Sequence, residues 1–126
     1  MADLRSPLSK VKGLGSAKEG THHFWHQRLT SLLLIPLVLW LGFSLAAMPV
    51  DHATLVEWIR QPFVTVLLVL LIVVVFYHAQ LGLQVVLEDY ISSHAQRTIS
   101  LLLTNFLCLL LGIVGVVSVL KISLGA

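Results

Sequence analysis

The chain has few charged residues and a single cysteine. Of its 126 residues, 11% are Asp, Glu, Lys or Arg, whereas 57% are hydrophobic, and the mean hydropathy is +0.94. A soluble domain of this size could not bury so much apolar surface, so lipid must solvate most of the chain. The single cysteine, Cys108, excludes an internal disulfide, and we interpret it as a small packing residue.

Lys, Arg, Asp and Glu are absent from three long apolar runs, which cover residues 29–48, 63–87 and 99–120. Each run is long enough to cross a bilayer as a helix. A transmembrane β-barrel would instead need alternating segments of ~10 residues, which the sequence lacks. We therefore predict an all-α membrane protein in which a polar N-terminal segment, residues 1–28, precedes three transmembrane helices within residues 29–126.

The first apolar run has a competing interpretation as a secretory signal. Against it, 28 residues of polar sequence precede the run, the run is longer than a usual signal core, and no convincing small-residue cleavage site follows. We therefore predict a retained helix. Residues 1–22 are rich in Gly, Ser and Lys, and we expect them to be extended or partly ordered.

The basic residues are distributed unevenly between the two sides of the predicted bundle. Six lie in the tail or in the second loop, residues 88–98: Arg5, Lys10, Lys12, Lys18, Arg28 and Arg97. Only Arg60, in the first loop, and Lys121, near the C-terminus, lie on the other side. Because basic residues accumulate on the cytoplasmic side, this predicts a cytoplasmic N-terminus and a periplasmic C-terminus. The net charge of +2 expresses this asymmetry, and we infer no nucleic-acid partner from it.

Small residues recur at every fourth position of the third run, at Ser100, Thr104, Cys108 and Gly112. In lipid, such a ridge marks a surface along which helices approach closely. We therefore expect the third helix to pack on protein along this ridge, within the bundle or against a partner chain.

His78 is the only histidine in the three runs, and an imidazole at membrane depth must find a partner. Gly82 follows four residues later, which removes side-chain bulk beside the imidazole and would let a flat group lie against the helix. Asp89 follows after eleven residues, or about 1100° of rotation, so it shares a helix face with His78 roughly 16 Å away along the axis.

Three interpretations of His78 remain open at this point. It could be a structural histidine bonded to a neighbouring helix, a proton-relay residue, or an axial haem ligand, which needs a neutral imidazole nitrogen in an apolar slot. A relay usually shows several ionisable groups along its path. One histidine supplies one axial position, so six-coordinate haem iron would take its other ligand from another polypeptide. The remaining histidines are interpreted as solvated interface or loop residues: His22, His23, His26, His52 and His94.

Asp89 and Tyr90 lie where the second helix reaches the membrane surface. They could be ordinary interface residues. A phenol can also donate a hydrogen bond to a carbonyl oxygen, and a carboxylate can hold a cation or pass a proton. Arg28 starts the first helix on the same side, so the three side chains could converge. A hydrophobic quinone that takes up protons on reduction would need such a setting.

Two segments carry a family resemblance. The tail GSAKEGTHHFW and the segment FYHAQLGLQVVLEDY, followed by a third apolar helix, resemble the hydrophobic membrane anchor subunits of succinate dehydrogenase of the alphaproteobacterial and mitochondrial type. The family pattern on the second helix is a histidine, a glycine four residues later and an Asp-Tyr pair at the helix end. His78, Gly82, Asp89 and Tyr90 match it, and the resemblance extends from about Gly13 onward.

The resemblance implies a noncatalytic anchor of succinate:ubiquinone oxidoreductase, complex II of the respiratory chain and tricarboxylic acid cycle. Its implied partners are a second, cytochrome b-type anchor subunit, an iron–sulfur subunit and a flavoprotein subunit, which would oxidise succinate. This chain has no cysteine cluster and no dinucleotide-binding fingerprint of its own. The implied location is the bacterial inner membrane, rather than the mitochondrial one.

The resemblance also implies site residues. His78 would be one axial ligand of a haem b shared with the second anchor, so that the haem iron is the metal it binds. Tyr90 would hydrogen-bond a ubiquinone carbonyl, Asp89 would assist electrostatically or in protonation, and Arg28 would lie near the quinone or the haem propionates. Two alternatives stay open: an anchor of a related fumarate reductase, and a purely structural membrane assembly protein.

Overall fold

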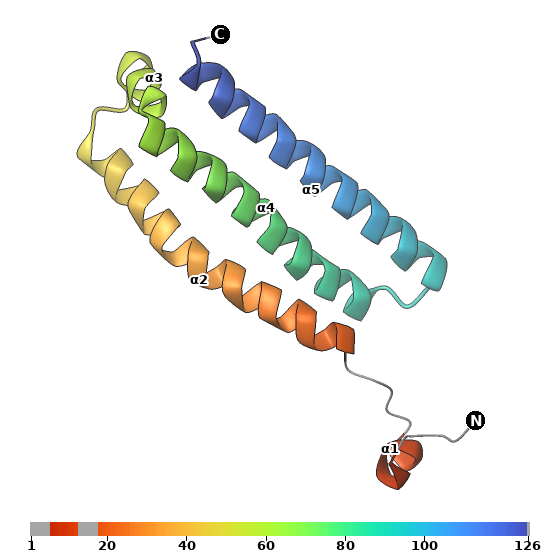
Figure 1. Ribbon diagram of the computed structural model, residues 1–126. Helices are drawn as coiled ribbons and strands as arrows, with labels where there is room; N and C mark the ends of the chain where they lie inside the picture. The colour runs from red at the N-terminus through yellow and green to blue at the C-terminus, as the bar shows by residue number, and fades with distance from the viewer. Residues whose placement is uncertain (1–5, 13–17, 126) are drawn as a thin grey trace.

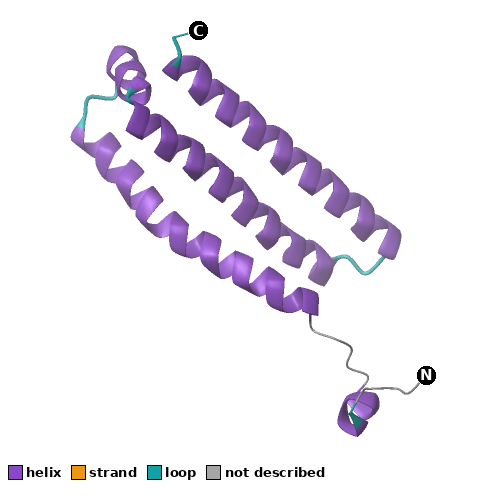
Figure 2. Ribbon diagram, viewed as in Figure 1, coloured by secondary structure: helices purple, strands orange, loops and turns teal. Residues whose placement is uncertain are grey.

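The computed structural model describes residues 6–12 and 18–125, and this part of the chain is helical with no strand (Figure 2). The five helices are α1 (Pro7–Lys12), α2 (Lys18–Ala47), α3 (His52–Arg60), α4 (Pro62–Tyr90) and α5 (His94–Ser123). Within the described residues, three segments are long and apolar enough to cross a membrane: Gly20–Ala47, Pro62–Tyr90 and His94–Ser123. The prediction of an all-α protein with three membrane-spanning helices is therefore confirmed.

The three long helices extend beyond the apolar runs of the sequence. At 29 or 30 residues each, they are about 43–45 Å long, whereas hydrocarbon is roughly 30 Å thick. Helix α5 begins inside the expected loop 88–98, so residues 91–93 alone link it to α4. Residues 7–12 and 18–22, expected to be extended or partly ordered, are helical. Polar terminal turns continue these helices because backbone hydrogen bonding does not require apolar side chains.

Helix α4 lies between α2 and α5, and each long helix runs antiparallel to the next (Figure 1). Most buried apolar side chains belong to α4: Val64, Leu71, Val74 and Leu81. Most large apolar side chains of α2 and α5 are exposed, as expected for helices that lipid surrounds. The start of α2 and the α4–α5 turn lie at one end of the bundle, whereas α3 and the C-terminus lie at the other.

Helix α3 ties the three long helices together at the second end. Asp51 caps it by accepting hydrogen bonds from the amide (3.1 Å) and the hydroxyl (2.6 Å) of Thr54, and both bonds lower the pKa of Asp51. The Trp58 ring of α3 stacks on Trp40 of α2 with 5.6 Å between ring centroids. Arg60 donates from Nε to the carbonyl of Ile122, near the end of α5.

The ridge of small residues on α5 faces α4 over part of its length. Cys108 is buried, which confirms its interpretation as a packing residue. A Cβ atom added at Gly112 would lie 3.7 Å from Phe76, in ordinary contact. A Cβ atom added at Gly115 would lie only 3.2 Å from Cγ2 of Ile72. At Gly115 the approach of the two helices therefore leaves no free space for a side chain.

This difference predicts how substitutions at the two glycines affect stability. Gly112→Ala should leave the stability unchanged or raise it by up to about 1 kcal/mol, because alanine favours the helix and has room. Gly115→Leu should lower it by roughly 1–3 kcal/mol, because the β-branched Ile72 cannot move aside freely. Thermal unfolding in detergent measures both, and equal stability of the two variants would contradict the prediction.

Candidate functional site

His78 lies on α4 and is half-buried against α2. Its Nδ1 is 2.9 Å from the hydroxyl oxygen of Thr30, a buried residue of α2 with 8% of its surface exposed. The same hydroxyl oxygen is 2.7 Å from the carbonyl oxygen of His26 and 3.1 Å from that of Gln27, both in the preceding turn of α2. One threonine therefore connects the imidazole to the backbone of the neighbouring helix.

This geometry selects one tautomer of the His78 imidazole. The Thr30 hydroxyl has a single hydrogen, which it donates to the backbone carbonyl oxygens of its own helix. Its oxygen is then the acceptor, so Nδ1–H of His78 is the donor in the 2.9 Å contact. In the neutral form of the ring, the lone pair then resides on Nε2. This atom has no hydrogen-bond partner among the described residues and is not one of their fully buried polar atoms.

A neutral imidazole with an available Nε2 lone pair fits the requirement of an axial haem ligand. Its other nitrogen is oriented by a hydrogen bond, as is usual for metal-binding histidines. No group of three or more His, Cys, Asp or Glu residues in the described part of the chain could hold a metal ion by itself. A single imidazole nitrogen suits one bond to an iron that a macrocycle already holds.

A groove of about 490 Å³ lies between α2 and α4, and its lining begins at Gly82, one helical turn after His78. Gly82 and Val85 of α4 line it, together with Phe24, Gln27 and Arg28 of α2. A Cβ atom added at Gly82 would meet only Nε2 of Gln27, at 3.7 Å. Packing between α2 and α4 would therefore tolerate a side chain at position 82. The glycine instead leaves this part of the groove empty within the chain.

Polar groups line the same groove. The guanidinium carbon of Arg28 lies 5.2 Å from the centroid of the Phe24 ring, a cation–π distance. Among the described residues, Nε2 of His23 and Oε1 of Gln27 are buried without a hydrogen-bond partner. The groove therefore combines a positive charge with unsatisfied polar atoms, a setting that favours a ligand with hydrogen-bonding or anionic groups.

Asp89 and Tyr90 occupy the last turn of α4 and are exposed, Tyr90 by 83%. Arg97 of α5 donates from Nε to the carbonyl oxygen of Ile91 (3.0 Å), which holds the short turn that follows them. Arg28 does not join this pair, because among the described residues no hydrogen bond or ion pair links it to either side chain. The expected convergence of Arg28 with Asp89 and Tyr90 is therefore not a direct contact within this chain. Arg28 lies beside Gly82 and Val85 instead.

Three polar pairs beside α4 were not identified from the sequence. The Tyr77 hydroxyl is 2.8 Å from Nδ1 of His26, Gln80 donates to Asn105 of α5 at 3.1 Å, and Gln84 donates to Glu88 at 2.9 Å. His26, which we interpreted as solvated, thus bonds to α4 although it is exposed. Residues 77, 80, 84 and 88 are three or four positions apart and so share one face of α4. This spacing was the sequence signal that could have identified a polar face on the helix.

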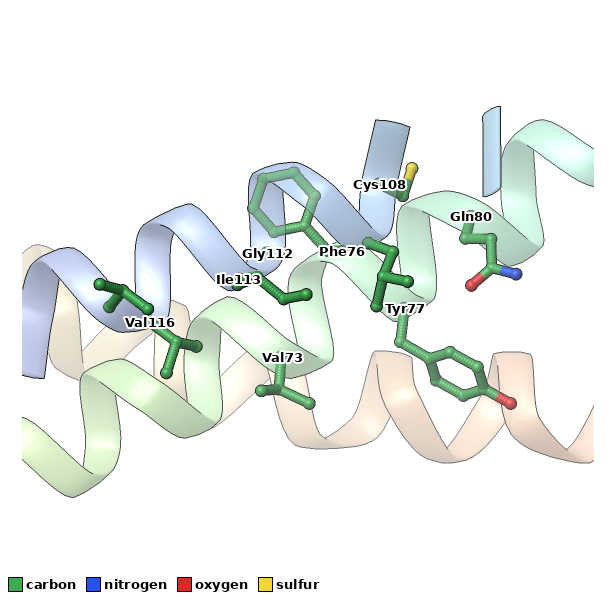
Figure 3. A pocket seen from close by; sticks show the side chains of 10 residues that line it. Val73, Phe76, Tyr77, Gln80, Cys108, Gly112, Ile113 and Val116 are labelled. Carbon is green, nitrogen blue, oxygen red and sulfur yellow. The ribbon is translucent and has the colours of Figure 1, made fainter. Parts of the chain in front are cut away.

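A second groove, of about 370 Å³, lies between α4 and α5 (Figure 3). Its lining is mostly apolar and includes Val73, Phe76, Gly112 and Ile113. Figure 3 shows Tyr77 at its edge with the ring directed toward α2. The lining includes neither His78 nor the Asp89–Tyr90 pair, so this groove is separate from the candidate site.

Comparisons with known proteins agree with the resemblance seen in the sequence. The profile of the family described as succinate dehydrogenase/fumarate reductase transmembrane subunit matches residues 2–115. The chain is 37% identical over 109 residues to the succinate dehydrogenase hydrophobic membrane anchor subunit of Rickettsia conorii, covering 85% of this chain and 86% of that protein. It is 33% identical over 118 residues to the protein of the same name from Rickettsia bellii, covering 93% and 94%.

A more distant relative, from Paracoccus denitrificans, has the same name and is 26% identical over 93 residues, covering 73% of this chain and 72% of that protein. No solved structure matches the chain significantly. The family match covers most of the chain, and the two Rickettsia relatives align with it over most of their own length. The chain therefore belongs to the succinate dehydrogenase/fumarate reductase transmembrane subunit family.

Proposed function

We propose that this membrane anchor subunit binds haem b through His78 and contributes Tyr90 and Asp89 to a ubiquinone site of complex II. The chief support is the Thr30–His78 hydrogen bond, which leaves Nε2 of His78 available as a ligand. The anchor itself is noncatalytic. Succinate oxidation takes place on a flavoprotein subunit, and electrons reach the membrane domain through an iron–sulfur subunit.

The haem supplies one-electron redox chemistry when it is bound. His78 of α4 would hold the haem iron from this chain, and a second, cytochrome b-type anchor subunit would hold it from the other side of the site. Gly82 keeps the helix surface beside His78 free of a side chain. The groove that Gly82 lines also contains Arg28, whose guanidinium suits a haem propionate as well as a quinone oxygen.

Reduction of ubiquinone to ubiquinol requires two electrons and two protons. The electrons arrive from the iron–sulfur subunit, and the protons come from the aqueous side of the site. Tyr90 donates a hydrogen bond to a quinone carbonyl oxygen, which stabilises negative charge as it develops there. The neighbouring Asp89 carboxylate holds or passes a proton. Because both side chains are exposed in this chain, partner subunits must cover them to complete the site.

The proposal includes a location and an orientation. The asymmetry of basic residues favours a cytoplasmic start of α2 and a cytoplasmic α4–α5 turn, with α3 and the C-terminus in the periplasm. Asp89 and Tyr90 then face the side on which the iron–sulfur and flavoprotein subunits dock. The membrane is the bacterial inner membrane.

An anchor of fumarate reductase is the second candidate function, because the family description includes that enzyme. The same residues would then serve a quinol that donates electrons. The relatives named above are succinate dehydrogenase anchors, which favours the first candidate. The quinone type of the host membrane distinguishes the two, since a low-potential quinone suits fumarate reduction.

His78→Ala tests the ligand assignment. In the purified complex the substitution should abolish or alter the reduced-minus-oxidised haem spectrum, because the axial bond from this chain is lost. His52→Ala removes an exposed histidine at the other end of the bundle and should leave the spectrum unchanged. An unchanged spectrum in His78→Ala would show that His78 is a structural histidine, as in a purely structural assembly protein.

Gly82→Leu tests whether a flat group lies against α4. A leucine there would project into the groove between α2 and α4, one helical turn from His78, so the haem content of the purified complex should fall. Gly42→Leu is the matched control, because nothing lies within 4 Å of a Cβ atom at Gly42 and the helix propensity changes equally. Equal haem content in the two variants would argue against a group beside Gly82.

Tyr90→Phe tests the quinone contact. Succinate:quinone reductase activity should fall roughly 2- to 100-fold, the range expected for loss of one hydrogen bond of about 0.5–3 kcal/mol. Succinate oxidation with an artificial acceptor should persist. Equal loss of both activities in Tyr90→Phe would indicate a structural role instead.

A further inference from the structure

We propose that Thr30 is a positioning residue that orients the His78 imidazole and tunes the midpoint potential of the haem. This inference rests on the proposed haem ligation by His78 and extends it to a residue of a different helix. It assigns to α2 a direct influence on the redox centre, although α2 supplies no ligand.

The first step is the fixed direction of the Thr30 hydroxyl. Its oxygen lies 2.7 Å from the carbonyl oxygen of His26 and 3.1 Å from that of Gln27, so the hydrogen is directed back along α2. A β-branched side chain in a helix has few rotamers available, and this one is buried. The acceptor lone pair that faces His78 is consequently held in place before any haem binds.

The second step is the alignment of α2 with α4 at this level. The turn of α2 that ends at Thr30 also contains His26, whose Nδ1 is 2.8 Å from the hydroxyl of Tyr77. Tyr77 and His78 are consecutive residues of α4. Two side-chain contacts between one turn of α2 and one turn of α4 thus determine where the His78 ring lies.

The third step concerns the electronic effect on a bound iron. A hydrogen bond accepted from Nδ1–H increases the electron density and basicity of an imidazole ligand. The low dielectric constant at membrane depth strengthens such a bond. A more basic ligand stabilises the ferric state relative to the ferrous state and lowers the midpoint potential. Removal of the Thr30 acceptor should therefore raise the potential.

The test uses the purified complex and a potentiometric titration of its haem. Thr30→Val preserves the side-chain shape and removes the hydroxyl, whereas Thr30→Ser preserves the hydroxyl and removes the methyl group. Ser31→Ala is the matched control. The Ser31 hydroxyl is 3.0 Å from the Gln27 carbonyl oxygen and 2.8 Å from that of Arg28, so it bonds back to α2 as Thr30 does. Neither of those bonds reaches α4.

The expected result is a raised midpoint potential in Thr30→Val and wild-type potentials in Thr30→Ser and Ser31→Ala. The low-spin ferric g values should also shift in Thr30→Val, because they depend on imidazole orientation. A wild-type potential in Thr30→Val would overturn the inference, as would an equal shift in Ser31→Ala. If Thr30→Val loses the haem, retention with the wild-type potential in Thr30→Ser supports the role of the hydroxyl, and loss in both overturns it.

His78→Ala in the same series distinguishes failure of the haem-ligand assignment from failure of the inference about Thr30. If His78→Ala removes the haem signal while Thr30→Val keeps the wild-type potential, the ligand assignment holds and the inference about Thr30 fails. If His78→Ala leaves the signal unchanged, the ligand assignment fails and the role of Thr30 fails with it.

Discussion

The hydrogen bond between Nδ1 of His78 and the hydroxyl of Thr30 crosses the contact between α2 and α4, and the geometry of the candidate site depends on it. Polar groups at membrane depth have little water available, so each needs a partner within the protein. The neighbouring Tyr77–His26 contact meets the same requirement one residue away. These contacts align α2 with α4, fix the tautomer of His78 and thereby define which nitrogen remains available.

Helix α4 carries both proposed sites, the haem ligand and the residues of the quinone site, at two depths in the membrane. His78 lies in its apolar part, and the exposed Asp89 and Tyr90 form its final turn. Because the helix packs on α2 along one side and on α5 along the other, both sites are parts of one rigid element. Gly115 lets α5 approach Ile72 closely, and Arg97 holds the turn after Ile91. An anchor subunit can therefore present groups at two depths with a fixed separation.

The features that depend on composition and periodicity could be predicted from the sequence. Lipid selects for apolar side chains, so three uncharged runs predicted three helices, and an isolated His78 identified the second of these helices as the carrier of the candidate site. The packing role of Cys108 followed from the spacing of small residues on α5. The family match came from the pattern on α4.

Features that depend on which helix faces which could not be predicted. Thr30 precedes His78 by 48 residues, and its role appears only once α2 and α4 are aligned. The polar partner of Tyr77 was missed because His26 lies outside the apolar runs. Helix α3 lies within the expected first loop, and its amphipathic pattern and the Asp51 N-cap were the signals available for it. Arg28 is on the expected helix, but its position beside Gly82 follows from packing.

The length of α4 has a consequence for where the proposed quinone would meet Tyr90. A helix of 29 residues exceeds the hydrocarbon thickness by about 13 Å, so its terminal turns rise into the layer of lipid headgroups. An amphiphile with a polar ring and a long isoprenoid tail orients itself in the same layer. Such a molecule could reach the phenol by lateral diffusion, with its tail still dissolved in the bilayer and only its ring leaving the lipid.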